Sequence, residues 1–425
     1  MRTSVDDLDM TTFVVFAIIL VSLTSAQMSY RQTHKIDPFA HNPALLLTLL
    51  LVLVLALCLS NRTIRVCLLA GYTFAFGVFE RALHVFDFTF YSDVLLATKE
   101  AIRVIFSGGN IYLHVFRSSV PPGQPFKYGP FEPIFYIPFY LAFGDLRVAE
   151  LFSSIIVMAL IFSLGRFTGY SKTLIPLALY ASWGIIIEST GSGVNDDSAG
   201  MLGFLSVFLL ILSMNRKSKG LASASAIVLG LSICFKLFPA LFAPFIVLVI
   251  FNLRDEAPIK WKYYLSLTVT TILVLSLPYL VISPQPYLNN IFFGNIDRLV
   301  TFQYQWHIWN SVLNRDSFLY LPRLLNTDVN TLIFIVPKAM LAISLATMTL
   351  LLVMARKATS LARAIGCGVI TWFVLLIGGP WFPASFLAFI APFVCSLPIL
   401  DLAWGKRDQL GPYHKPPYEM ESGPS

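Results

Sequence analysis

Residues 87–135 read DFTFYSDVLLATKEAIRVIFSGGNIYLHVFRSSVPPGQPFKYGPFEPIF and interrupt a series of long apolar runs with a stretch rich in polar, aromatic, glycine and proline residues. Most of the other runs are long enough to cross a bilayer, which takes about twenty apolar residues. A polar segment of this length between such runs is where a membrane protein can carry out chemistry. The contrast predicts a bundle of membrane spans and indicates where to look for a site.

Composition defines the class of the chain. Of its 425 residues 56% are hydrophobic and only 12% are charged, and the mean hydropathy is +0.73. Soluble domains carry about 25% charged residues, so we expect an all-α polytopic membrane protein. The net charge of +7 comes mostly from short basic clusters between apolar runs and does not suggest a nucleic-acid partner. The five cysteines lack metal-ligand or CxxC spacing and are expected to pack as small apolar residues.

The apolar runs predict about twelve membrane spans, with eleven and thirteen as the limits. They lie near residues 11–29, 43–60, 64–86, 148–166, 172–190, 197–214, 220–236, 237–253, 262–283, 330–354, 362–379 and 383–403. The run Pro130–Phe143 is shorter, aromatic and contains Pro133 and Pro138. It suits a juxtamembrane or re-entrant helix better than a full crossing.

The basic clusters predict the orientation, because cytoplasmic loops carry an excess of Lys and Arg. The clusters are Arg216–Lys219, Arg254–Lys262, Arg356–Lys357 and Lys406–Arg407. Both termini then lie in the cytoplasm, including the tail 405–425, while the first loop 87–147 and a second loop 284–328 face outward. The chain 1–425 forms a single transmembrane domain. A crossing at Pro130–Phe143 would invert every segment that precedes it.

Two acidic residues of the first loop are candidates for catalysis. Transfer of a sugar to a hydroxyl needs a base, and a carboxylate also stabilises the positive charge that develops at the anomeric carbon. Asp93 opens a helical stretch whose Val94, Leu95, Ile102, Val104, Ile105 and Phe106 suit the membrane surface, and Asp87 lies just before it. The alternative is that Asp93 serves only as a helix N-cap.

Further along the first loop, Lys127 and Tyr128 precede the aromatic run and could bind a phosphate or a sugar hydroxyl. The alternative is an aromatic belt that anchors this helix at the interface. Asn195 and the two adjacent carboxylates Asp196 and Asp197 open a span and could bind sugar hydroxyls or a divalent cation; they could equally only cap the helix.

Lys236 lies between two apolar runs, and an intramembrane lysine is costly enough to be a functional candidate. A lipid-linked phosphate would be its partner, unless the side chain only snorkels to the interface. Arg298 and His307 of the second loop could complete the site, although a single His among aromatic residues is more often structural. We find no Walker A motif, no GxGxxG and no His/Cys metal cluster, so apart from the possible divalent cation no cofactor is expected.

Taken in order, these elements resemble the C-type (GT-C) superfamily of integral-membrane glycosyltransferases, and within it the polyprenyl-phosphate-mannose-dependent mannosyltransferases and arabinofuranosyltransferases. The resemblance covers residues 64–310. It rests on Asp93, on Gly108-Gly109-Asn110-x-Tyr112, on Phe126-x-Tyr128-x-Pro130, on the Gly-x-Asn-Asp element 193–196 and on Lys236-x-x-Pro239. The chain differs where Ile111 and Gly129 stand in place of prolines of the family pattern.

The resemblance implies transfer of a sugar, mannose or another hexose, from a polyprenyl- or dolichyl-phosphate donor to a glycan or glycolipid acceptor. Transfer would occur with inversion on the extracytoplasmic face, with Asp93 as the base and basic residues at the carrier phosphate. The rival interpretation is a transporter or flippase of lipid-linked or amphiphilic cargo, which would need charges along a pathway or inverted repeats. A third is a non-catalytic scaffold subunit that uses the polar loop for docking.

Overall fold

The computed structural model describes residues 3–31, 42–87, 91–119, 122–253, 256–293, 329–377 and 384–405. Within these ranges the protein is all-helical and has no strands; a single isolated bridge joins Phe116 and Gln124. The prediction of an all-α fold is confirmed.

Helices occupy the predicted apolar runs. They are α1 (Thr3–Arg31), α2 (Asn42–Cys58), α3 (Arg62–Asp87), α6 (Arg147–Ser163), α8 (Tyr170–Ser182), α9 (Gly184–Ser192), α10 (Asp196–Arg216), α11 (Lys219–Phe235), α12 (Ala243–Leu253), α13 (Trp261–Ile282), α18 (Val329–Met354), α19 (Leu361–Ile377) and α20 (Leu387–Ala403). Shorter elements connect them: α4 (Asp93–Phe106), α5 (Phe131–Phe143), α7 (Gly165–Thr168), α14 (Pro284–Leu288), the 3-10 turns η2 (Phe238–Leu241) and η7 (Ala384–Phe386), and the π-helical turn η4 (Asn289–Phe293).

Several helices are long and apolar enough to cross a membrane. In the part of the chain that the structure describes, four helices have the length and composition of a membrane span: Arg62–Phe86, Arg147–Thr168, Asp196–Arg216 and Trp261–Ile282. A fifth is possible if α8 and α9, which bend by 50° at their junction, form one broken span. The apolar parts of the other helices, such as Leu8–Leu23 of α1 and Ala342–Met354 of α18, are shorter over the described residues, so the count of about twelve crossings stays a prediction.

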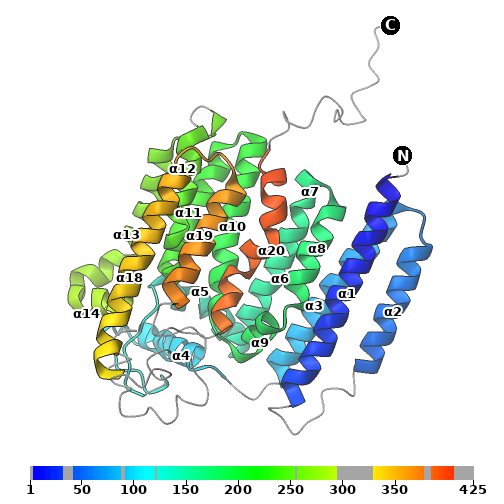
Figure 1. Ribbon diagram of the computed structural model, residues 1–425. Coiled ribbons are helices and arrows are strands. Elements are labelled where there is room, and N and C mark those ends of the chain that lie inside the picture. Colours follow the sequence, from blue (N-terminus) through cyan, green and yellow to red (C-terminus); the bar gives the residue numbers. More distant parts are fainter. Residues whose placement is uncertain are drawn as a thin grey trace.

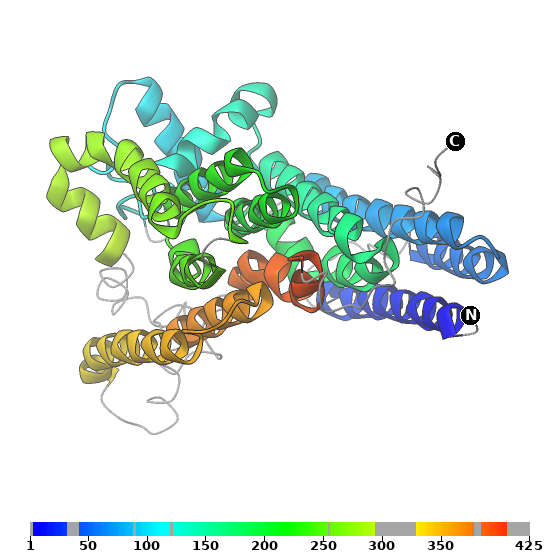
Figure 2. The ribbon, with the colours of Figure 1, turned by 90° about the horizontal axis from the view of Figure 1, so that it is seen from above.

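The helices form a bundle with α10 near its centre, packed against α6, α11 and α20. Figure 2 shows α1, α2 and α3 on one flank and α13 with α14 on the opposite flank. In Figure 1, α4, α9 and α14 lie at one end of the bundle, whereas the start of α1 and the end of α20 lie at the other. The end that carries α4 and α9 is called the α4 end below.

Helix α5 is short and packs against α4, α6 and α11 at the α4 end. It contains 13 residues and stops at Gly144, whose φ of 69° and N–H bond to the Tyr140 carbonyl make a left-handed C-cap. The structure therefore confirms a short helix here. Whether it enters the membrane as a re-entrant segment stays a prediction.

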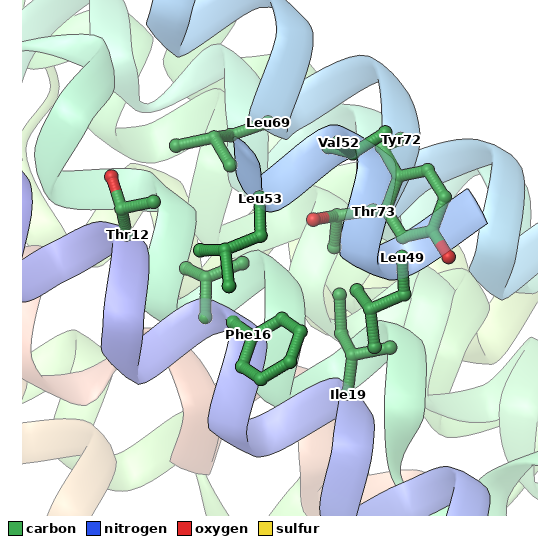
Figure 3. A pocket seen from close by; sticks show the side chains of 10 residues that line it. Thr12, Phe16, Ile19, Leu49, Val52, Leu53, Leu69, Tyr72 and Thr73 are labelled. Atoms are coloured by element: carbon green, nitrogen blue, oxygen red, sulfur yellow. The ribbon is translucent and has the colours of Figure 1, made fainter. Parts of the chain in front are cut away.

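A separate apolar pocket lies among α1, α2 and α3 (Figure 3). Phe16, Ile19, Leu49, Leu53 and Leu69 line it, and Tyr72 closes one side. Its walls offer few polar groups, so this pocket is not where the candidate site residues gather.

Candidate functional site

Lys236 is the centre of a buried polar cluster at the α4 end. It follows directly after α11 and is only 8% exposed. Its Nζ lies 2.5 Å from Asp196 Oδ1 and 3.0 Å from Asn195 Oδ1, and both partners open α10. The structure thus joins three of the predicted site residues in one ion pair and one hydrogen bond.

Aromatic rings enclose the same ammonium. The Lys236 Nζ lies 5.9 Å from the ring centroid of Tyr128, 5.0 Å from that of Phe238 and 4.8 Å from that of Phe386. A cation over a ring face within about 6 Å is attracted by the ring quadrupole. The ammonium is therefore held by a carboxylate, an amide and three rings, and snorkelling to the interface does not describe it.

The sequence around Gly129 explains how Tyr128 reaches Lys236. The Gly129 N–H donates to the Phe235 carbonyl at 3.2 Å, at the end of α11. A Cβ at this position would lie 1.9 Å from the Cys234 carbonyl oxygen, so only glycine lets the two segments approach so closely. Gly129 thereby brings residues 126–130 close to the backbone beside Lys236.

Glu132 extends the cluster toward α4. Its side chain is completely buried, and its Oε1 accepts hydrogen bonds from Thr98 Oγ1 at 2.6 Å and from Asn195 Nδ2 at 3.2 Å. We call Thr98, Glu132, Asn195, Asp196 and Lys236 the polar cluster. It connects α4, α5, α10 and the end of α11 through side-chain contacts.

A second buried carboxylate supports the start of α10. Glu150 of α6 accepts hydrogen bonds from the Ser198 N–H at 3.1 Å, from Ser198 Oγ at 2.5 Å and from the Tyr136 hydroxyl. Glu150 thereby satisfies an amide in the first turn of α10, where a negative charge is also favoured by the helix dipole. Asn195 is the N-cap residue of α10 but makes no side-chain cap bond of its own, and Asp196 and Asp197 lie in the first turn.

Asp197 makes its hydrogen bond outside the polar cluster. Its Oδ2 accepts a hydrogen bond from Thr190 Oγ1 at 2.8 Å, and its Oδ1 is buried without a hydrogen-bond partner in the described part of the chain. Asp196 and Asp197 therefore have different partners: Asp196 pairs with Lys236, and Asp197 accepts a hydrogen bond from Thr190. The described residues contain no group of three or more His, Cys, Asp or Glu residues that could hold a metal ion.

The start of α4 places Asp93. Ser92 is the N-cap of this helix, because its hydroxyl accepts a hydrogen bond from the Val94 N–H at 3.2 Å. The alternative that Asp93 is the N-cap is therefore wrong; Asp93 is the first residue inside the helix and is half-buried. The Ser92 N–H donates to the Ser192 carbonyl at 2.8 Å and ties this start to α9.

Asp93 and the polar cluster share α4. Thr98 follows Asp93 by five residues, a rise of about 7.5 Å along the helix axis. The expectation that Leu95 and Ile102 lie on the membrane surface is wrong, since both are completely buried inside the protein. This inner face of α4 is packed rather than lipid-exposed, which fixes the position of Asp93 relative to Thr98.

The Gly-Gly-Asn-x-Tyr element supports Tyr128 from the other side. The Tyr112 hydroxyl donates to the Tyr128 carbonyl at 2.8 Å. Asn110 accepts a hydrogen bond from the Tyr112 N–H at 2.9 Å and donates to Ser283 Oγ at 2.9 Å. Two sequence motifs thus meet at Tyr128, next to Lys236.

The other predicted site residues lie apart from this cluster or outside the description. Lys127 Nζ donates to Gln124 Oε1 at 3.1 Å within its own loop. Asp87 ends α3, and its side chain lies outside the described part, as do Arg298 and His307 entirely.

Sequence reasoning missed Thr98, Glu132, Glu150 and Arg81. Arg81 is completely buried in α3 and donates to the carbonyls of Gly77, Ala181 and Tyr180 at 3.0, 2.7 and 2.8 Å. An arginine or glutamate within an apolar run is itself a signal, because intramembrane charges are rare and usually functional. For Arg81 the carbonyl partners in α3 and α8 indicate a structural role that ties these two helices together, while its Nε has no hydrogen-bond partner among the described residues.

Comparison with protein-family models, with curated proteins and with solved structures found no match for this chain. The polar cluster, its buried charges and the helix that carries Asp93 are therefore the basis for a functional assignment.

Proposed function

We propose that the chain is a membrane glycosyltransferase that transfers a hexose, such as mannose, from a polyprenyl- or dolichyl-phosphate donor to a glycan or glycolipid acceptor. The observation that carries this proposal is the polar cluster. Elements that are far apart in the sequence, around Tyr128, Asn195 and Lys236, meet there beside the helix that begins with Asp93.

In the proposed reaction Asp93 acts as the general base. It takes the proton from the acceptor hydroxyl while that oxygen attacks the anomeric carbon, and the bond from this carbon to the phosphate oxygen breaks on the opposite face. The carrier phosphate leaves with the bonding electrons, so the anomeric centre is inverted. Asn195 and Asp196 supply hydrogen-bond acceptors for sugar hydroxyls.

The charge of Lys236 limits its part in the reaction. Asp196 already compensates the ammonium at 2.5 Å, so Lys236 could contact a carrier phosphate only by exchanging its carboxylate partner for it. Lys127, which pairs with the neutral Gln124, is the second candidate for the phosphate. A compact ammonium can serve as a point charge for phosphate in either position.

The proposed orientation follows the basic loops. About twelve spans would leave both termini in the cytoplasm and the α4 end outside, where nucleotide sugars are absent. A lipid carrier would then supply the sugar. This arrangement agrees with the basic residues that lie around the start of α11, at the end of the bundle away from α4.

The test uses the purified protein in nanodiscs with radiolabelled polyprenyl-phosphate mannose or glucose and a glycolipid acceptor. We expect label to move to the acceptor with the wild type. Asp93→Asn should lower turnover by roughly 10²–10⁴-fold, the usual cost of losing a general base, while donor binding stays near that of the wild type. Glu188→Gln, an exposed carboxylate of α9 at the same end, is the matched control.

If Asp93→Asn turned over at the wild-type rate, Asp93 would not be the general base. If the wild type transfers no sugar but moves the labelled lipid across the bilayer of proteoliposomes, the transporter interpretation replaces the glycosyltransferase one.

A further inference from the structure

Glu132 occupies a place in the polar cluster to which the proposed chemistry assigns no role. It comes from the first turn of α5, is completely buried, and contacts Thr98 of α4 and Asn195 at the start of α10. Both contacts use the same carboxylate oxygen, and Oε2 has no hydrogen-bond partner among the described residues. Glu132 is thus the group through which α4 is joined to α10.

The two neighbours of Asn195 define the orientation of its amide. The amide nitrogen faces the Glu132 carboxylate at 3.2 Å, and the amide oxygen faces the Lys236 ammonium at 3.0 Å. The reversed amide would place NH₂ against the ammonium, which has no lone pair to accept a hydrogen bond. The amide oxygen therefore faces Lys236, and the amide nitrogen donates to Glu132.

The two hydrogen bonds that Oε1 accepts are the part of Glu132 that holds its neighbours in place. A glutamine could accept the same two hydrogen bonds on its amide oxygen, whereas an alanine can accept neither. Asp196 contacts the Lys236 ammonium directly, and Glu132 reaches it through Asn195.

We propose that Glu132 is a positioning residue that holds the Asp93 helix in register with Asn195 and Lys236. This inference rests on the proposed function, because the register matters only if groups of α4 and α10 act on one substrate. Glu132 acts through two contacts: Thr98 fixes α4, and Asn195 transmits the position to Lys236. A misplacement of about 1 Å in a reacting group costs on the order of 10²-fold in rate.

The experiment is a double-substitution cycle of Glu132→Ala and Asn195→Ala, with turnover and donor affinity measured in nanodiscs. Glu132→Ala alone should lower turnover by about 10²-fold and leave the donor Kd within about threefold, since positioning is expressed in the transition state rather than in donor binding. In the Asn195→Ala background Glu132→Ala should add less than about threefold, because interacting residues are not additive. Glu132→Gln keeps an acceptor oxygen for Thr98 and Asn195 and should retain most of the turnover, and Glu188→Ala serves as the control for loss of a carboxyl group at this end.

The inference is overturned if the two single effects multiply, or if Glu132→Ala has wild-type turnover. Thr98→Val keeps the test decisive if Glu132→Ala does not fold. It removes the contact with Glu132 together with the bond of Thr98 Oγ1 to the Val94 carbonyl. Thr98→Val should lower turnover at unchanged donor affinity, whereas Thr98→Ser should restore it; equal turnover of Thr98→Val and wild type would also overturn the inference. Failure of the proposed function is recognised separately, because then the wild type itself transfers no sugar.

Discussion

Lys236 and Asp196 form an ion pair with 2.5 Å between Nζ and Oδ1, and both side chains are almost completely buried. The two residues come from the end of α11 and the start of α10, so each needs the other to offset its lost hydration. Removing one partner of a buried pair typically costs about 3–5 kcal/mol. We expect Lys236→Met to lower the free energy of unfolding by about this amount, measured by thermal unfolding in detergent.

The second substitution Asp196→Asn should restore much of the stability lost in Lys236→Met, because it removes the unpaired carboxylate. Lys236→Arg keeps the charge and should be the least affected single variant. An unfolding temperature of Lys236→Met equal to that of the wild type would mean that the pair contributes nothing to the fold. In that case a phosphate, rather than Asp196, becomes the better partner for the ammonium.

At the scale of elements, Glu100 fastens the loop that follows α4 onto that helix. Its carboxylate accepts hydrogen bonds from His114 Nε2 at 2.9 Å, from the Arg117 and Ser118 N–H groups at 3.4 and 3.1 Å and from Ser118 Oγ at 2.5 Å. Partial burial raises the pKa of Glu100, but these bonds outweigh it and lower the pKa to about 2. The stabilisation of the folded state by the Glu100 carboxylate is therefore fully present above the unfolded pKa of about 4.3 and is lost as the pH falls toward 2.

Glu100→Gln should open this loop at neutral pH, because the new amide places an N–H group against donors that now face a carboxylate. We expect faster hydrogen exchange of the Arg117 and Ser118 amides than in the wild type. Arg103→Gln, an exposed change on the same helix, is the control. Equal exchange in Glu100→Gln and Arg103→Gln would show that the carboxylate does not hold the loop.

The helices were predictable because long apolar runs leave few alternatives to a helix in a membrane. The bends of these helices and the neighbours they pack against were not predictable from the sequence. The run 172–190 was predicted as one span, yet it bends by 50° between α8 and α9, next to Gly184. Periodicity identified the apolar residues of α4, but only the packing of α4 against α5 and its neighbours decided that Leu95 and Ile102 face protein.

For the whole molecule, the polar cluster depends on contacts between residues separated by 34 to 63 positions in the sequence. The individual residues Asn195, Asp196 and Lys236 could be chosen from the sequence because charged groups in apolar surroundings need partners. Which partners they find is decided by the packing of α4, α5, α10 and α11, and no local pattern reports this. Glu132 was passed over for the same reason: beside an aromatic run it resembles an ordinary first-turn acid.

The orientation of the bundle is the remaining property of the whole molecule, and cysteine labelling tests it. Cys58 and Cys67 are exposed and would be replaced by serine. Ser107→Cys after α4 and Glu188→Cys in α9 both lie at the α4 end, whereas Lys219→Cys at the start of α11 lies at the opposite end. The contact of Asn215 with the Ala403 carbonyl at 2.8 Å independently joins that end to the end of α20.

An impermeant maleimide added to intact cells should label the cysteines at 107 and 188 and should reach the one at 219 only after permeabilisation, because Arg216, Lys217 and Lys219 favour the cytoplasm. Labelling of 107 and 188 from opposite sides would mean that α5 crosses the membrane and adds a thirteenth span. If the cysteine at 219 were labelled from outside while those at 107 and 188 stayed protected, the bundle would have the opposite orientation in the membrane. The polar cluster would then face nucleotide sugars, and a lipid carrier would no longer be needed to supply the donor.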